Sequence, residues 1–190
     1  LIYMKVLIAC EFSGIVRDAF LNIPIKDVDI EVYGIALDDL EHILSKYGIV
    51  RKVGKVFGVL RIDGLDIDWS LPRTDGAGRK PTVITYQDMS YKQAFQRRDL
   101  TINSMGIDWI AGQWIDPYHG LIDIENKTLR VTDVTFFKED PLRYFRVMQF
   151  MARFEFLPDA MLYEIGNCMD VDNLSSERIT QEFYKLFVLG

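Results

Sequence analysis

The sequence contains little cysteine and histidine and no long apolar run. Two cysteines and two histidines occur among 190 residues. Cys10 and Cys168 have neither the spacing of a disulfide framework nor that of a metal site. No segment approaches the roughly eighteen consecutive apolar residues of a membrane helix. These absences argue against a disulfide scaffold, a Cys/His metal module and a membrane-spanning protein.

An excess of positive charge is also missing. The chain has 22 basic and 28 acidic residues, which gives a net charge of -6. Its overall field therefore does not attract nucleic acid, and contact with RNA requires a local basic patch. Hydrophobic residues make up 49% and charged residues 26%, a composition typical of a soluble globular protein with a real core. A general nucleic-acid coat is excluded, whereas an enzyme acting on an RNA end is not.

Hydrophobic periodicity predicts a mixed α/β part followed by a helical part, with the change between about Val131 and Asp140. The predicted strands cover residues 5–9, 27–33, 59–62 and 65–71, and the predicted helices cover residues 14–21, 37–47, 159–170 and 176–189. An Asp63-Gly64 turn predicts a hairpin. Residues 74–89 are polar and rich in Gly and Pro, which predicts a mobile surface loop. From Pro141 onward we expect helices throughout, with one buried stripe formed by Leu142, Phe145, Met148 and Met151.

Carboxylates alternate with apolar residues in KDVDIEVYG, residues 26–34. A strand places alternate side chains on opposite faces, so Asp27, Asp29 and Glu31 would share one face. An amphipathic strand with a wet acidic face explains this pattern. A divalent-metal site explains it too, because two Mg²⁺ ions about 3.5 to 4 Å apart need a cluster of carboxylates. Asp68, in LDIDWSLPR, offers a further acid from the hairpin.

A second pattern precedes this strand, in EFSGIVRD, residues 11–18. It predicts a strand, a turn at Ser13-Gly14 and a helix. The N-terminus of such a helix presents free backbone N–H groups that can hold a phosphate. A tight turn without a ligand is the plain alternative. Next to an acidic strand, however, a phosphate-binding turn is typical of nucleotidyl transfer.

Six segments, in this order and spacing, together resemble the class II tRNA nucleotidyltransferase and poly(A) polymerase family. They are SGIVRD, KDVDIEVYG, QRRDLTINSMGID, DPYHGLIDI, KEDPLRYFRVMQFMARFEF and SSERITQEFYKLF. The resemblance covers nearly all of the chain from residue 13. It implies an α+β, polymerase-β-like head with a mixed sheet and flanking helices over residues 1–138, and a helical neck over residues 139–190.

The resemblance also implies an activity. Members of the family add C, A or both from CTP and ATP to the 3′ end of an RNA without a template. The resemblance implies that the RNA of this protein is a tRNA. Two Mg²⁺ ions serve as cofactors, and we expect a cytoplasmic location in a bacterium or a phage-infected host. Further helical domains hold the tRNA in this family, so a missing C-terminal domain or a partner subunit is expected to hold the RNA.

Site residues follow from the same resemblance. Gly14 is expected against the triphosphate, with Ser13 and Arg17 beside it. Asp27 and Asp29 are expected to bind the metals, and Asp68 to supply a catalytic acid from the neighbouring strand.

Two further motifs complete the expected site. The RRDxxxN pattern resembles the motif that recognises ribose and triphosphate, and it consists of Arg97, Arg98, Asp99 and Asn103. The EDxxR pattern resembles the motif that reads the Watson-Crick edge of the incoming base through Asp140 and Arg143. These two residues share a helix face at i and i+3. One aspartate can accept from the amine that A and C both carry, while the arginine donates.

Plainer interpretations remain for each motif. Asp140 before Pro141 is also a good helix cap. Arg97 and Arg98 also fit a solvated surface pair. The aromatic residues between 144 and 156 fit a core better than a base-stacking platform.

Two departures from the family leave alternatives open. The turn has one glycine where the family has two, and Ser13 brings a Cβ to a place of close approach. A non-catalytic nucleotide-binding or partner-docking remnant of the family is therefore the main alternative. The first 20 residues also resemble the opening of certain phage DNA cytosine methyltransferase-like proteins. No later Pro-Cys motif supports a methyltransferase.

Overall fold

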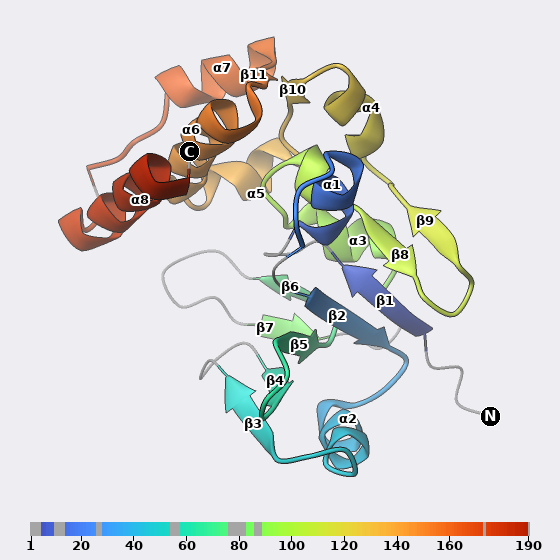
Figure 1. Cartoon of the computed structure of the whole chain (residues 1–190). Helices are drawn as coiled ribbons and strands as arrows, with labels where there is room; N and C mark the ends of the chain where they lie inside the picture. The colour runs from blue at the N-terminus through green and yellow to red at the C-terminus, as the bar shows by residue number, and fades with distance from the viewer. Residues whose placement is uncertain are drawn as a thin grey trace.

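The computed structural model describes residues 5–9, 14–25, 28–53, 58–75, 83–85, 89–172 and 174–189. These residues form a seven-stranded sheet with the strand order β3-β4-β5-β2-β1-β8-β9 (Figure 1). Its strands are β1 (Lys5–Ala9), β2 (Val28–Tyr33), β3 (Val50–Val53), β4 (Val59–Ile62), β5 (Ile67–Ser70), β8 (Gly106–Asp108) and β9 (Gln113–Ile115). Within this sheet β2 and β5 pair in parallel, and the other neighbours pair antiparallel. The mixed sheet agrees with the expected α+β class.

Helices flank this sheet and gather at one end of it. They are α1 (Ile15–Phe20), α2 (Leu37–Leu44), α3 (Tyr91–Gln96), the 3₁₀ helix η1 (Thr101–Asn103), α4 (Gly120–Glu125), α5 (Val134–Lys138), α6 (Leu142–Phe154), α7 (Ala160–Asn167) and α8 (Ser176–Leu189). In Figure 1, α2 lies below the sheet, whereas α1 and α3 lie above it. Among the described helices, none has the length and apolar character needed to cross a membrane.

Strand β2 is buried on both faces. Ile30 and Val32 pack with Leu40 of α2 and with Leu60 of β4 in one apolar cluster. The opposite face carries the acids, and Glu31 is fully buried there. The expectation of a wet acidic face is therefore wrong, because α3 and the residues after it cover this side of the sheet.

A second apolar cluster joins α1 to η1, α4, α5, α6 and α7. It extends in sequence from Val16 through Leu100 and Phe137 to Ile165. The predicted stripe on α6 is only partly right, because the buried residues of this helix are Leu142, Val147, Phe150 and Phe154. A strict three-residue repeat drifts around a helix of 3.6 residues per turn. The division at residues 138 and 139 stays a prediction, and this cluster contains residues from both sides of it.

Two short sheets were not expected from the sequence. Strands β6 (Arg73–Asp75) and β7 (Val83–Thr85) pair antiparallel where a loop was predicted, and residues 76–82 and 86–88 lie outside the described residues. Strands β10 (Thr128–Leu129) and β11 (Leu157–Pro158) pair in parallel. The second pair interrupts the helical run expected after Pro141, because the backbone of residue 157 bonds to residue 127.

Candidate functional site

Two acids from different strands lie side by side on the buried face of the sheet. Asp29 of β2 and Asp68 of β5 are register partners in the parallel pair. Register partners on neighbouring parallel strands point to the same face and lie about 4.8 Å apart. Asp29 is 8% exposed, and Asp68 accepts a hydrogen bond of 2.6 Å from Nε of Arg61. The sheet therefore builds a pair of carboxylates from residues far apart in sequence.

The surroundings of this pair fit a hard cation. Carboxylate oxygens are the ligands that Mg²⁺ prefers. The next positions in the same row of the sheet are residue 9 of β1 and Gly106 of β8. Among the described residues, no group of three or more potential ligands forms a metal cluster, and Asp27 lies outside them. Asp29 is thus the described one of the two expected metal ligands, and Asp68, the expected catalytic acid, is its register partner.

The glycine turn before α1 is shaped by an arginine. Gly14 has a φ of 61°, a left-handed conformation that other residues adopt only with strain. A Cβ at this position would also overlap the guanidinium of Arg17. Position 14 therefore requires glycine for two separate reasons. Ser13 lies outside the described residues.

The guanidinium of Arg17 is buried in a protein network. Nε and Nη2 donate to Asp18 at 2.8 and 2.7 Å, and Nη1 donates to Asn103. Its carbon lies 5.2 and 4.9 Å from the ring centres of Phe150 and Phe154. Arg17 therefore joins α1 to η1 and α6, and its expected contact with the nucleotide stays a prediction.

The arginines of the RRD motif are buried against the acidic strand. Arg97 and Arg98 are 6% and 4% exposed, so the interpretation of a solvated pair is wrong. The Nη2 atoms of both residues lie 3.3 Å from Oε1 of Glu31. Arg98 also donates to the carbonyl of Asn103 at 3.1 Å and stacks over Phe95, with its carbon 4.1 Å from the ring centre. Both guanidinium groups are thus held on the face that carries Asp29.

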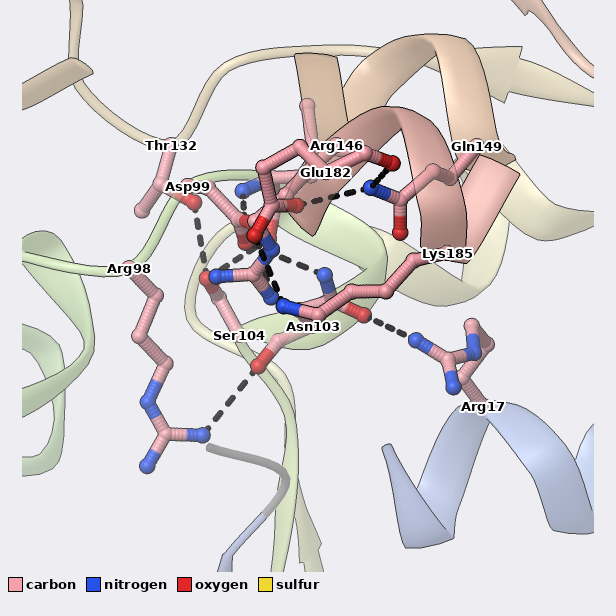
Figure 2. A network of polar contacts seen from close by, with 11 residues as sticks. Arg17, Arg98, Asp99, Asn103, Ser104, Thr132, Arg146, Gln149, Glu182 and Lys185 are labelled. Carbon is pink, nitrogen blue, oxygen red and sulfur yellow. Dashed lines mark hydrogen bonds and ion pairs between the residues drawn. The ribbon is translucent and has the colours of Figure 1, made fainter. Parts of the chain in front are cut away.

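Asp99 and Asn103 connect this motif to α6 (Figure 2). Asp99 accepts from Nδ2 of Asn103 at 3.0 Å and from the amide of Leu100 at 2.8 Å. Its other oxygen lies 3.1 Å from Nη2 of Arg146. Burial by itself raises the pKa of Asp99, but Arg146 and these hydrogen bonds outweigh it and hold the pKa below its usual value.

The network continues from α6 to α8. Nε2 of Gln149 donates to a carboxylate oxygen of Glu182 at 2.7 Å, and Lys185 bonds to the other oxygen at 2.7 Å. Figure 2 shows these residues beside Arg146. Helix α6 therefore carries one polar contact to the RRD motif, through Arg146, and another to α8, through Gln149.

The EDxxR residues lie at the start of α6. Oδ1 of Asp140 accepts from the amide of Leu142 at 3.2 Å, in agreement with the helix-capping alternative, and Oδ2 lies 3.4 Å from Arg178. Arg143 donates to the carbonyl of Phe136 at 2.6 Å. Burial lowers the pKa of Arg143, although the carboxylates of Asp99 and Asp140 oppose the shift. Arg143 therefore lies within the electrostatic reach of the RRD motif.

Several charged residues of this region were missed from the sequence. Glu31 was noticed in the acidic strand but received no role, and Arg146 lies one turn beyond the motif residue Arg143. Asp18 is 4% exposed and pairs with Arg17. The signal available for Arg146 was its spacing of three residues from Arg143, which keeps it on a nearby part of the helix surface.

Comparison with known proteins gives the family. The model of the poly A polymerase head domain matches residues 12–130, which is more than half of the chain. The chain belongs to this family. The family resemblance expected from the six segments is thereby confirmed.

Relatives of the chain include proteins named Multifunctional CCA protein. The chain is 36% identical over 184 residues to a Multifunctional CCA protein of Mannheimia succiniciproducens, with 91% of this chain and 42% of that protein covered. It is 35% identical over 185 residues to the corresponding protein of Haemophilus ducreyi, with 91% and 43% covered. The chain thus spans less than half the length of these relatives.

Solved structures show the same fold. A CCA-adding enzyme in complex with CTP has a TM-score of 0.78 and 27% identity, and the match covers 98% of this chain and 43% of that one. The Thermotoga maritima CCA-adding enzyme complexed with tRNA has a TM-score of 0.77 and 27% identity, with 98% and 44% covered. The α+β head fold expected for the family is therefore confirmed.

Proposed function

We propose that this poly A polymerase head-domain protein adds C, A or both from CTP and ATP to the 3′ end of an RNA, and that the RNA is a tRNA. The observation that supports this most directly is the position of Asp29. It lies beside Asp68 across β2 and β5, and it shares its strand face with Glu31, which holds Arg97 and Arg98. Acids for metal ions and arginines for phosphate oxygens thus meet on one face of the sheet.

The reaction is a phosphoryl displacement. The 3′ hydroxyl oxygen of the RNA forms a bond to the α-phosphorus of the nucleotide, and the bond from this phosphorus to the bridging oxygen of the β-phosphate breaks. Pyrophosphate leaves, and the hydroxyl proton is lost to a base. Asp27 and Asp29 would hold the metal ions, and Asp68 would supply a further catalytic acid from the neighbouring strand. When Mg²⁺ is bound there, it neutralises negative charge on the phosphate oxygens.

Arg97 and Arg98 face the triphosphate in this proposal. Phosphoryl transfer depends mainly on positioning and charge neutralisation, and a guanidinium offers several N–H donors in a fixed plane. Gly14 allows the backbone of the turn, together with Ser13 and Arg17, to approach the same phosphates. Asp99 pairs with Arg146, and Asn103 accepts a hydrogen bond from Arg17, so both residues are held in place next to Arg97 and Arg98. In this proposal Asp99 and Asn103 contact the ribose.

Asp140 and Arg143 select the base. The carboxylate accepts from the exocyclic amine that A and C share, and the guanidinium donates to ring nitrogen or carbonyl. U and G carry no amine at the corresponding position, so they leave the carboxylate without a donor. The CCA-adding enzymes of this fold have been solved with CTP and with ATP, which supports these two nucleotides as substrates.

The RNA itself requires more than the described residues. The relatives are more than twice as long as the matched region, and the net charge of the chain is -6. We therefore propose that further C-terminal helical domains, or a partner subunit, hold the tRNA in the cytoplasm.

The test combines binding with transfer. We expect ATP and CTP, in the presence of Mg²⁺, to raise the melting temperature of the chain, since a ligand that binds only the folded state stabilises it. GTP and UTP should not do so. Asp29→Asn should lose this stabilisation and all incorporation into a tRNA that lacks its 3′ end, with an unchanged fold. Asp66→Asn changes an exposed acid between β4 and β5; it is the matched control and should behave like the wild type.

The outcomes separate the alternatives. Normal incorporation by Asp29→Asn contradicts the proposal. Nucleotide binding without incorporation, when the RNA-binding region is also supplied, identifies the non-catalytic remnant. Stabilisation by S-adenosylmethionine instead of nucleotides would favour the methyltransferase.

A further inference from the structure

Glu31 is the third acid of the β2 strand, and its surroundings differ from those of Asp29. Its carboxylate is 0% exposed. Oε1 lies 3.3 Å from Nη2 of both Arg97 and Arg98, and Oε2 accepts from the hydroxyl of Tyr33 at 3.0 Å. Glu31 is therefore committed to protein contacts and is not placed to act as a further metal ligand.

Tyr33 fixes the orientation of this carboxylate. It lies two residues beyond Glu31 on the same face of β2 and is 3% exposed. Its ring packs edge-to-face on Tyr91, with 5.1 Å between ring centres, and Tyr91 bonds to Asp108 at 2.6 Å. Burial, followed by the charge of Glu31, raises the pKa of Tyr33, so the hydroxyl stays protonated and donates. The acid is thus held from one side by a rigid aromatic pair.

One nitrogen of Arg98 has no hydrogen bond. Its Nε is buried and lacks a hydrogen-bond partner among the described residues. A buried donor without a partner is uncommon in native proteins. An anion with several oxygens would supply the acceptor that this donor lacks.

We propose that Glu31 is a positioning residue that holds Arg97 and Arg98 in the orientation that binds the triphosphate of the incoming nucleotide. This inference rests on the proposed function and assigns a role that the family motifs do not include. It also accounts for the run of three acids, since Asp27 and Asp29 serve the metal ions and Glu31 serves the arginines. Strand β2 thereby sets the distance between the proposed metal site and the two arginines that bind the triphosphate.

The test measures how affinity depends on the number of phosphates. We expect Glu31→Gln, which keeps the shape of the side chain and removes its charge, to weaken ATP binding about tenfold. AMP binding should change less than about twofold, because AMP lacks the β- and γ-phosphates. The ratio of ATP to AMP affinity, measured by calorimetry with Mg²⁺, should therefore fall. Glu41→Gln, which removes the acid of the exposed Lys52 pair, is the control and should keep the wild-type ratio.

A second variant guards against loss of folding. Tyr33→Phe keeps every charge and removes only the hydrogen bond to Glu31, so we expect the ATP to AMP ratio to fall about threefold. An unchanged ratio in this variant, or an equal loss for ATP and AMP in Glu31→Gln, overturns the inference and leaves Glu31 a structural residue.

Inorganic tripolyphosphate separates this inference from the proposed function. If the wild type binds tripolyphosphate but no nucleotide, and Glu31→Gln loses this binding, the inference holds and the proposed function fails. If the wild type binds neither tripolyphosphate nor nucleotides, both are overturned.

Discussion

The carboxylate of Asp99, in the segment after α3, lies 3.1 Å from the guanidinium of Arg146 on α6. The side chain of Asp99 is 4% exposed and that of Arg146 is 30% exposed, so water screens the pair only partly. This contact joins the segment after α3 to helix α6. The residues that we expect to contact the nucleotide lie on both sides of it.

Asp99→Asn should destabilise the fold. Removing one partner of a buried ion pair leaves the other uncompensated, which costs about 3 kcal/mol. Because the pKa of Asp99 is lowered in the folded state, its contribution is present above the unfolded value of 3.8 and is lost as the pH falls through the folded value. Urea unfolding from about pH 7 to about pH 3 should show the difference from wild type shrinking in acid. A difference that is constant with pH would contradict the ion-pair explanation, and Asp66→Asn serves as the exposed control.

Gly14→Ala should cost more stability than Gly112→Ala. Both glycines have a positive φ, at 61° and 64°, but a Cβ at position 112 meets nothing within 4 Å. Gly112→Ala therefore measures the backbone cost alone, about 1 kcal/mol. Gly14→Ala adds the overlap with Arg17, which raises the cost by a further 1 to 3 kcal/mol or so. Denaturant unfolding of the two variants checks this, and equal costs would show that Arg17 moves aside freely.

Asp68→Asn should change the dependence on Mg²⁺ more than it changes stability. Its pair with Arg61 is part-exposed, and such pairs contribute about 1 kcal/mol or less. We expect half-maximal activity to require about tenfold more Mg²⁺, because the negative charge beside the metal ligand Asp29 is lost. Asp63→Asn, in the turn of the β4–β5 hairpin, breaks an exposed pair with Arg51 of β3 and should leave the Mg²⁺ requirement unchanged. Equal Mg²⁺ requirements for both variants would show that Asp68 does not assist metal binding.

Asp140→Asn should alter the choice of nucleotide. The amide nitrogen brings a donor to a position that previously accepted, so discrimination of ATP and CTP against GTP and UTP should fall about tenfold or more. Arg178→Gln removes the ion-pair partner of Asp140 at the surface and should change this discrimination by less than about twofold. Competition assays with the four nucleotides measure both variants. A loss of stability in Asp140→Asn with unchanged selection would leave only the helix-capping role.

Local sequence patterns were sufficient to predict several strands and turns of the head domain. Strand β1 agrees with its predicted range, and the Asp63-Gly64 turn joins two antiparallel strands as expected. Alternation in β2 also predicted which residues share a face. These features depend on neighbours in sequence, so the sequence specifies them directly.

Long-range contacts explain what the sequence did not predict. The environment of Glu31 depends on Arg97 and Arg98, which are separated from it in sequence by five of the described strands, β3 to β7. The ion-pair partner of Asp99 is Arg146, which lies on α6, a helix that begins at Leu142. Arg146 is therefore outside the RRDxxxN motif that contains Asp99. Alternation alone predicts a solvated acidic face and a buried acidic face equally well. Only the packing of α3 on this side of the sheet shows that the face is buried.

The parallel pairing of β2 with β5 also makes the carboxylate pair depend on the folded sheet. Asp29 and Asp68 are distant in sequence and become neighbours only when this long-range pairing forms, which is a slow type of contact to establish. Their mutual repulsion opposes the pairing until a cation or a nearby arginine offsets it. An incomplete or misfolded chain therefore has no assembled carboxylate pair.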